Sequence, residues 1–325
     1  MYLVDKNSSL IENKDIVCIY HYGCIDGVLS AALLSTYFNN IDYIKGYHNE
    51  NIEYYESYIQ KCINKNVYIV DYVPPKSVLL EIASVCKTLV VLDHHQDKYY
   101  AYKAQNHYKN KTYIKISKNR SGVGMAYDFM EENNLLHVKD KNKIKLIVDD
   151  MSKYDLWKHK RGSREEKISL FLRNFEKNSP SYVKKVIFDN CNIDAFYKAG
   201  DSLSKSFNEV INNYQKHFST SKTKFKDKNK KNNEGIIIHN CGTYYFNELA
   251  NHIMDKENIN FVIDINTSKE NNKAGLSIRS NNNTAFEIAQ KYNGGGHNDA
   301  AGTVISYTKY EKMFLEYLKK GCFIL

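Results

Sequence analysis

The chain has 325 residues, a formal net charge of +9 at pH 7 and 42% hydrophobic residues. This length allows two domains, each with a core of its own, and the positive charge favours a polyanionic partner such as a nucleic acid or a nucleotide. No stretch approaches the roughly 18 apolar residues of a membrane span, and the N-terminus lacks a signal-peptide pattern. The sequence therefore predicts a soluble protein with no membrane partner.

The cysteines point to a reducing compartment. There are seven of them, and no two form a CxxC pair. An odd number without metal-binding spacing argues for reduced thiols, so we expect a cytoplasmic or nuclear protein rather than a secreted one.

Short apolar strands alternate with helical patterns in the first half of the chain. Strands are expected at residues 15–22, 67–73 and 89–92, and helices at 28–38, 54–62, 76–86, 121–133 and 141–150. Pro74 and Pro75 end the second strand and begin the next helix, because proline is favoured in the first helical turn. This alternation predicts right-handed βαβ units and a parallel sheet.

The middle of the chain changes character. Residues 163–217 are helical and amphipathic, and residues 219–234 form the most hydrophilic stretch, with six lysines. One hypothesis is a basic arm that holds nucleic acid, and the other is a solvated loop between domains. We favour the loop, because lysine-rich segments of low complexity mostly need no partner.

A second α/β pattern follows the lysine-rich stretch. Strands are expected at 235–239, 261–265, 275–278 and 303–305, and helices at 246–256, 284–292 and from Tyr310 onward, with a helix start at Ala300-Ala301-Gly302. The fold class is therefore α/β, with a parallel-sheet domain at 1–160, a helical linker and lysine-rich loop at 161–234, and a smaller α/β domain at 235–325.

Acidic residues and histidines stand at the ends of the predicted elements of the first half. They are His21, Asp26, Asp71, Asp93, His94, His95 and Asp155, which lies just past a helix. Asp26 or Asp71 alone would more often be a helix cap or a turn residue, and His21 alone a hydrogen-bonded strand end, whereas the Asp93-His94-His95 triplet is rarer. Because the carboxyl ends of parallel strands share one edge, these side chains can converge there. Such donors suit Mn²⁺ or Mg²⁺, and less often Zn²⁺ or Fe²⁺.

At these motifs the chain resembles the DHH phosphoesterase superfamily, in the form with a DHH-associated C-terminal domain. Its members include RecJ-type exonucleases, oligoribonucleases and cyclic-dinucleotide phosphodiesterases. The matching segments, in family order, are Ile19 to Gly27, Val70-Asp71, Asp93-His94-His95, Ser277-Ile278-Arg279-Ser280 and Gly294-Gly295-Gly296-His297. Asp155 best matches the aspartate of the fourth motif, with Asp150 or Asp149 as alternatives. The resemblance covers nearly the whole chain.

The resemblance implies two metal positions, most simply two Mn²⁺ ions. His21 and Asp71 would hold the first, while Asp26, Asp71, His94 and Asp155 would hold the second, which makes Asp71 the bridge. Asp93 would orient His94 from outside the ligand set, as carboxylates do for ligating imidazoles. His95 would be catalytic and face the scissile phosphate.

Cys24 departs from the family pattern, because most of the superfamily has an aspartate at this position. The chain is similar to a subset with the pattern H-x-x-C-x-D-G. A thiolate is a softer ligand than a carboxylate and would shift the preference toward Zn²⁺ or Fe²⁺. Cys24 is either a ligand of the first metal or a bystander, and we favour the ligand.

In the second domain, the resemblance assigns the substrate's terminal phosphate or nucleotide to Arg279, Gly294, Gly295, Gly296 and His297. Taken alone, an arginine more often pairs with a neighbouring acid, and glycines after a helix are most often a C-cap. Three glycines in a row with a histidine exceed what a cap needs.

The resemblance therefore implies a metal-dependent phosphodiesterase that hydrolyses short oligonucleotides or nucleic-acid ends. Two other enzymes fit the same motifs: a cyclic-dinucleotide phosphodiesterase and a phosphatase of 3′-phosphoadenosine 5′-phosphate. Outside enzymes, a catalytically degenerate member would bind nucleic acid or a protein. Only Cys24 supports that last hypothesis, because the other motif residues are present.

Overall fold

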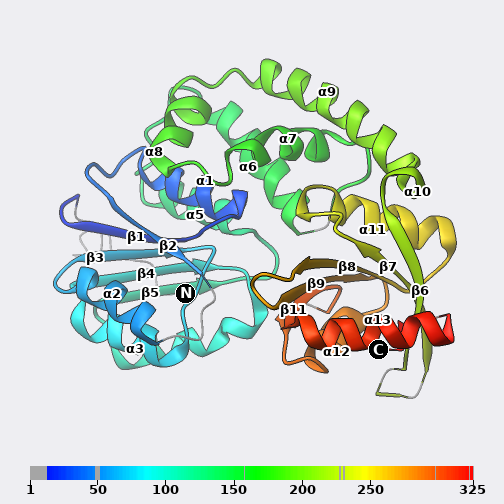
Figure 1. The fold of residues 1–325 in the computed structure, drawn as a ribbon. Helices are drawn as coiled ribbons and strands as arrows, with labels where there is room; N and C mark the ends of the chain where they lie inside the picture. Colours follow the sequence, from blue (N-terminus) through cyan, green and yellow to red (C-terminus); the bar gives the residue numbers. More distant parts are fainter. Residues whose placement is uncertain are drawn as a thin grey trace. The chain divides into compact units, whose positions relative to one another are not determined.

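A computed structural model describes residues 13–47, 52–156, 158–226, 228–229, 231–296, 298–321 and 323–324. The chain divides into two compact units, Met1–Ser204 (unit 1) and Lys205–Leu325 (unit 2), coloured from blue to green and from green to red in Figure 1. The division falls inside the segment 161–234 that was expected to link two domains. Each unit has a sheet and a core of its own, as the α/β class predicts.

Unit 1 is built on a five-stranded parallel sheet in the order β2-β1-β3-β4-β5. Its strands are β1 (Ile16–His21), β2 (Asp42–Gly46), β3 (Asn66–Val70), β4 (Thr88–Asp93) and β5 (Thr112–Ile116). The three strands predicted from the sequence are confirmed as the central β1, β3 and β4. Weaker patterns form the two edge strands.

Helices cover both faces of this sheet. The helices that begin in unit 1, some of which pack on other helices, are α1 (Ile25–Leu34), α2 (Ile52–Cys62), α3 (Lys76–Val85), η1 (Gln96–Ala101), α4 (Tyr102–His107), α5 (Gly122–Glu132), α6 (Lys141–Asp155), α7 (Arg164–Leu172), η2 (Arg173–Phe175), α8 (Pro180–Val183), η3 (Lys184–Asp189) and α9 (Ile193–Asn212), which runs past the division at Ser204. Tyr20 and Tyr68 share a core with α1 and α5, whereas Ile19 and Ile69 share one with α2 and α3. Burial on both faces explains the uninterrupted apolar runs of the strands.

Helix α6 extends beyond its predicted end at residue 150 and finishes at Asp155. The Asp140 carboxylate caps its start by accepting a hydrogen bond of 3.1 Å from the Lys143 backbone N–H. Asp155 therefore lies in the last turn of the helix rather than just past it. The helix fixes the direction of that side chain.

Unit 2 contains a seven-stranded mixed sheet in the order β10-β11-β9-β8-β7-β6-β12. The strands are β6 (Ser219–Lys226), β7 (Asn232–His239), β8 (Phe261–Ser268), β9 (Lys273–Ser280), β10 (Gly295–Gly296), β11 (Ala300–Ser306) and β12 (Phe323–Ile324), and the helices are α10 (Tyr214–His217), α11 (Thr243–Glu257), α12 (Thr284–Gln290) and α13 (Tyr307–Lys320). Helices α12 and α13 pack on one face of the sheet, and α11 lies on the other (Figure 1).

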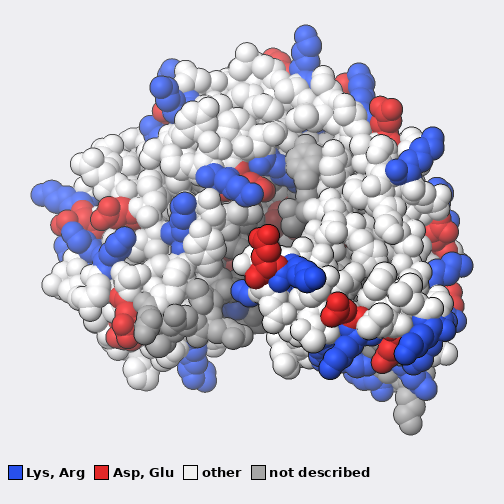
Figure 2. All heavy atoms as spheres, in the orientation of Figure 1, with Lys and Arg blue, Asp and Glu red and all other residues white. Residues whose placement is uncertain are grey.

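The lysine-rich segment contains strand β6 and the start of β7, so the predicted solvated loop is wrong. β6 pairs with β7 in antiparallel register. Lys222, Lys224 and Lys226 are exposed and alternate with buried Thr223 and Phe225. This is the period of a strand with one buried face, which the lysine content concealed. Lys and Arg side chains gather around β6 and α13 on the face seen in Figure 2.

The helix start expected at Ala300-Ala301-Gly302 is also wrong, because these residues begin strand β11. Alanine's helix preference is weak, and pairing with β9 along the whole strand overrides it. The neighbouring β10 contains two of the three predicted turn glycines and pairs with β11. A Cβ atom at Gly294 would lie 2.3 Å from the Gly302 carbonyl oxygen, so close packing requires glycine there.

Across the described residues, no helix combines the length and the apolar character that crossing a bilayer requires.

Candidate metal centre

Three neighbouring strands of unit 1 end at the same edge of the sheet, and each brings polar side chains there. His21 is the last residue of β1, Asp71 directly follows β3, and Asp93 ends β4 with His94 and His95 after it. Because β3 lies between β1 and β4, Asp71 lies between His21, at the end of β1, and the two histidines that follow β4. Open parallel sheets bind their ligands at this edge.

Asp71 is the centre of this group. Its carboxylate is 1% exposed, with Oδ2 lying 3.4 Å from His21 Nδ1 and Oδ1 lying 3.1 Å from His94 Nε2. Its backbone has a φ of 53°, in the left-handed region that is strained for residues other than glycine. The conformation turns the chain sharply at the end of β3.

The donor atoms fit divalent cations. Both carboxylate oxygens of Asp71 and Oδ2 of Asp155 are buried without a hydrogen-bond partner among the described residues, which is costly unless a cation satisfies them. The described residues include two sets of potential metal ligands, and within each set the ligand atoms lie within 4.8 Å of one another. One set is His21, Asp71 and His95, and the other is Asp26, Asp71 and His94. Imidazole nitrogens and carboxylate oxygens suit Mn²⁺, Mg²⁺, Zn²⁺ and Fe²⁺.

Asp26 is held by the start of another helix. Its Oδ1 accepts hydrogen bonds from Ser121 Oγ (2.9 Å) and Val123 N (3.1 Å), and its Oδ2 accepts one from Gly122 N (2.6 Å). A Cβ atom at Gly122 would lie 2.6 Å from Asp71 Cβ and 2.8 Å from Asp26 Oδ2, so only glycine fits. The sequence predicted a helix at residues 121–133, but it did not reveal that the start of this helix binds Asp26. The adjacent Ser-Gly pair at a helix start was the available signal.

The carboxylates and imidazoles shift one another's pKa values. Burial, together with Asp71 and Asp155, raises the pKa of Asp26 well above its ordinary value. Burial alone would also raise the pKa of Asp71, but the neighbouring imidazoles of His21 and His94 outweigh it and hold this pKa well below its usual range. Burial alone would lower the pKa of His94, whereas Asp71 and Asp155 raise it to about 10. Protons and cations therefore compete for the same cluster.

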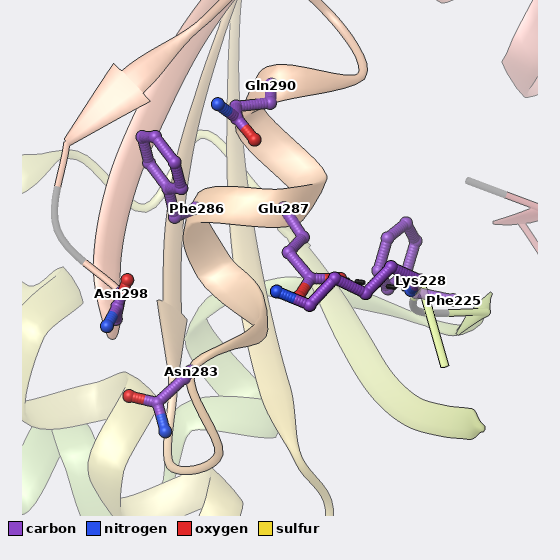
Figure 3. Close-up of a pocket in the computed structure, with 7 residues that line it drawn as sticks. All are labelled: Phe225, Lys228, Asn283, Phe286, Glu287, Gln290 and Asn298. Carbon is purple, nitrogen blue, oxygen red and sulfur yellow. Dashed lines mark hydrogen bonds and ion pairs between the residues drawn. The ribbon is translucent and has the colours of Figure 1, made fainter. Parts of the chain in front are cut away.

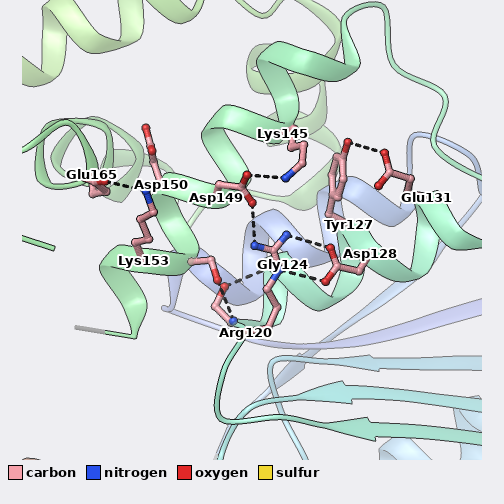
Figure 4. Close-up of polar contacts among 12 residues, drawn as sticks. Arg120, Gly124, Tyr127, Asp128, Glu131, Lys145, Asp149, Asp150, Lys153 and Glu165 are labelled. Carbon is pink, nitrogen blue, oxygen red and sulfur yellow. Dashed lines mark hydrogen bonds and ion pairs between the residues drawn. The ribbon is translucent and has the colours of Figure 1, made fainter. Parts of the chain in front are cut away.

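Asp155 joins this cluster, while the two alternative aspartates bind elsewhere. Oδ2 of Asp155 lies 3.3 Å from His94 Nε2, although neither set of potential ligand atoms among the described residues includes it. Asp150 accepts two hydrogen bonds from Arg164, at 2.7 and 2.8 Å. Asp149 accepts hydrogen bonds from Arg120 (2.8 Å) and Lys145 (2.6 Å), shown in Figure 4. Of the three candidates, the geometry favours Asp155.

Cys24 stands at the N-cap of α1, where its carbonyl accepts a hydrogen bond from Val28 N. Among the described residues, neither set of potential ligand atoms includes its Sγ atom. Burial, and then the charges of Asp71 and Asp155, raise the pKa of its thiol well above the ordinary value. The thiol therefore lies close to the cluster but outside both sets.

The Asp93 carboxylate contacts a different histidine from the one expected. Its Oδ1 is 2.7 Å from His95 Nδ1, whereas the resemblance assigned Asp93 to His94. His94 instead lies against Asp71 and Asp155. Consecutive residues that leave a strand point in different directions, so Asp93 and His95, two apart, face the same way.

In unit 2, Arg279 lies on β9 opposite Ala300 of β11. Its Nε donates to Asn247 Oδ1 (3.0 Å) and its Nη1 to the Ile278 carbonyl (2.7 Å), while the guanidinium lies 5.4 Å from the ring centre of Phe246. Burial lowers the pKa of Arg279 to about 10, so it remains a cation at neutral pH. Gly295 and Gly296 are exposed on β10, which pairs with β11. His297 lies outside the described residues.

Unit 2 also has a cavity of about 520 Å³ against α12 (Figure 3). An ion pair of 3.3 Å between Lys228 and Glu287 crosses it. The lining consists of Phe225, Lys228, Asn283, Phe286, Glu287, Gln290 and Asn298. It offers rings, amides and one ion pair, but no set of metal ligands among the described residues. The unit 1 cluster is therefore the stronger candidate for chemistry.

Comparisons with known families match both halves of the chain. Residues 15–152 match the family described as "DHH family, N-terminal domain", and residues 245–320 match the "DHHA1 domain". The three sheet-edge motifs up to Asp93-His94-His95 fall in the first match, as do Asp149 and Asp150, whereas Asp155 lies three residues beyond its end. Arg279 and the three glycines fall in the second.

Individual proteins are similar over most of the chain. An uncharacterized protein of Acanthamoeba polyphaga mimivirus is 25% identical over 337 residues, which cover 94% of this chain and 70% of the relative. The crystal structure of an exopolyphosphatase-related protein from Bacteroides fragilis has a TM-score of 0.50 and 13% identity, covering 94% of this chain and 92% of the other. RecJ from Thermus thermophilus, solved with Mn²⁺, has a TM-score of 0.49 and 11% identity, covering 95% of this chain and 53% of RecJ.

Proposed function

Because the chain belongs to the DHH superfamily and carries a DHHA1 domain, we propose that it is a metal-dependent phosphodiesterase acting on short oligonucleotides or nucleic-acid ends. The observation that carries this proposal is the convergence on Asp71, where two sets of potential ligands share one buried carboxylate. Phosphoesterases use paired cations about 3.5–4 Å apart for in-line displacement at phosphorus.

The proposed ligands come from the sheet edge and the adjoining helices. His21 and Asp71 would hold the first cation, with Cys24 as a neighbouring candidate, and Asp26, Asp71, His94 and Asp155 would hold the second. When bound, the cations supply Lewis-acid polarisation of the phosphoryl oxygen and activation of water. Asp71 keeps both positions together, and the α5 amides keep Asp26 in place for the second.

The proposed substrate contacts lie in unit 2. Arg279 is held by Asn247 and Phe246, and a fixed guanidinium suits the planar recognition of a phosphate. Gly294, Gly295 and Gly296 allow close approach to the backbone, and His297 adds a donor.

A turnover panel tests this proposal. The full-length protein is incubated with di- to pentanucleotides, 3′-phosphoadenosine 5′-phosphate and cyclic di-AMP, each with Mn²⁺, Mg²⁺ or Zn²⁺. We expect cleavage of the short oligonucleotides to be fastest. Preferred cleavage of either other substrate would replace the oligonucleotide assignment. Nucleotide binding without turnover under every condition would overturn the enzyme assignment and leave a binding protein.

A further inference from the structure

We propose that His95 is a ligand of the first metal position and that Asp93 is the carboxylate that orients it. The first position then has two imidazoles and one carboxylate, from His21, His95 and Asp71, and Cys24 is not a ligand. This inference rests on the metal dependence in the proposed function but not on any particular substrate.

The distances place His95 with the first position. Its ligand atom lies within 4.8 Å of those of His21 and Asp71. The ring centres of His95 and His21 are 6.0 Å apart, although the residues come from different strands. His95 thus faces the space that His21 and Asp71 also face.

The contact with Asp93 has the form of a ligand's outer partner. Asp93 Oδ1 is 2.7 Å from His95 Nδ1, and the Asp93 side chain is fully buried. Histidines that bind metals usually donate one ring N–H to a carboxylate, which fixes the ring and increases its basicity. The bond occupies Nδ1, so Nε2 is the atom that would meet the cation. In this structure the arrangement belongs to His95 and not to His94.

His94 has a different environment, which separates the two histidines in function. Its Nε2 faces the carboxylates of Asp71 and Asp155, and it belongs to the set that contains Asp26. The second position is therefore rich in carboxylates, while the first is rich in imidazoles.

Cys24 is the competing third ligand. Its Sγ is outside both sets among the described residues, although it precedes Asp26 by only two residues in the chain. In this proposal His95, which follows β4, supplies the ligand that the missing aspartate at position 24 would otherwise provide.

Different donor sets lead to different metals at the two positions. Two imidazoles and one carboxylate favour Zn²⁺, Fe²⁺ or Co²⁺, whereas a set rich in carboxylates suits Mn²⁺ or Mg²⁺. We therefore expect one tightly bound Zn²⁺ per chain, and a second position that Mn²⁺ fills. A pair of unlike cations is the predicted resting composition.

Metal binding measured without substrate tests the proposal. The full-length protein is stripped with a chelator and titrated with Zn²⁺ alone and with Mn²⁺ alone, using calorimetry and elemental analysis. His95→Ala should weaken the tight Zn²⁺ equivalent by more than about 100-fold, because losing only an outer partner costs about 10–100-fold. Asp93→Asn, which keeps the side chain's shape, should fall within that smaller range. Cys24→Ser and the exposed control His137→Ala should leave the affinity unchanged.

A spectroscopic measurement supplies a second criterion. With Mn²⁺ as the only metal, so that it fills both positions, electron spin echo reports coordinated imidazole nitrogens. The nitrogen signal should decrease in His95→Ala, whereas Asp26→Asn should leave the part of the signal that depends on His95 in place. Unchanged Zn²⁺ affinity and nitrogen signal in a folded His95→Ala variant would restore the phosphate-facing role. Loss of the tight equivalent in Cys24→Ser would identify the thiol as the ligand. Neither result depends on hydrolysis, so a failure of the proposed function is distinguishable.

Discussion

Oδ2 of Asp26 accepts a hydrogen bond of 2.6 Å from the backbone N–H of Gly122, 96 positions later in the chain. The start of α5, where helix amides carry partial positive charge, thus fixes a residue on α1. Asp71 packs against the same glycine: a Cβ atom added at Gly122 would lie only 2.6 Å from the Cβ atom of Asp71. One glycine therefore controls the separation of two proposed ligands.

Gly122→Ala is expected to weaken metal binding strongly while lowering the stability of the fold only moderately. The added methyl group must displace Asp71 or Asp26, which costs about 1–3 kcal/mol of stability as overpacking and about 10–100-fold in metal affinity as a lost support. Calorimetry with Mn²⁺ and thermal unfolding measure the two effects. Gly275→Ala is the matched control, because the added Cβ would lie 3.9 Å from its nearest neighbour, the Asn266 carbonyl oxygen. Equal behaviour of the two variants would contradict the prediction.

Asp71→Asn should lower hydrolysis on the order of 10²–10³-fold, the cost of losing one group that stabilises developing charge. The fold should survive, because asparagine tolerates the left-handed backbone conformation. Asp15→Asn is a close control: Asp15 also has a positive φ, of 52°, but pairs with Lys65 away from the centre. Rates under saturating Mn²⁺ and circular dichroism supply the comparison. Normal turnover in Asp71→Asn would refute the assignment of the bridge.

Asp149→Asn should reduce stability without affecting metal binding. Burial alone would raise the pKa of Asp149, but hydrogen bonds from Lys145 and Arg120 outweigh it, so its pKa lies below the ordinary 3.8. A lowered pKa means that the stabilisation is fully present above the unfolded pKa and is lost as the pH falls through the folded one. We expect about 1 kcal/mol at pH 7, reduced by solvent screening of this partly exposed pair, and a smaller difference at pH 3.

Urea unfolding at the two pH values measures this difference. Asp155→Asn, studied in parallel, should show the opposite pattern, with weakened metal binding. Loss of metal from Asp149→Asn would instead mean that Asp149 supplies the fourth motif.

Arg279→Lys should raise the KM for an oligonucleotide about tenfold, because a lysine cannot form the paired hydrogen bonds that a guanidinium makes with a phosphate. The kcat should change much less, since Arg279 belongs to unit 2 and the proposed metal ligands belong to unit 1. Steady-state kinetics separates the two constants, with the exposed Arg161→Lys as control. A fall in kcat at constant KM would move Arg279 into the chemical step.

Removal of metal should lower thermal stability as well as activity. A cation at about 100 times its dissociation constant adds about 2.7 kcal/mol to the native state. We expect chelation to lower the melting temperature of the wild type and Mn²⁺ to restore it. The Asp71→Asn variant should melt at nearly the same temperature with and without chelator, and a large shift in that variant would place the bound metal elsewhere.

The sequence predicted the central strands of unit 1 well, because burial on both faces leaves only apolar residues in them. It failed where one face is exposed and lysine-rich, as in β6, and where small residues such as Ala300 are placed by pairing rather than by propensity. The predicted helix at 141–150 ended five residues too early, because the last turn of α6 is polar. Asp155, at the true end of the helix, faces the candidate metal centre.

The motifs identified the residues of the candidate site but not how they pair. Nothing in the letters Asp93-His94-His95 says which histidine the carboxylate contacts, because the direction of each side chain depends on the turn after β4. The same limit hid the contact between Asp26 and α5, which only the folded chain brings together. Side-chain direction was the missing information.

Among the described residues, every non-glycine position with positive φ is an asparagine or an aspartate, and Asp71 is the buried one of that group. A left-handed conformation costs a residue with a side chain roughly 1–2 kcal/mol, and glycine avoids this cost. A library selected for heat resistance in the presence of a chelator should therefore accumulate glycine at position 71, and one selected for hydrolysis should restore aspartate. The residue at position 71 would then show whether a lineage had been selected for heat resistance or for hydrolysis.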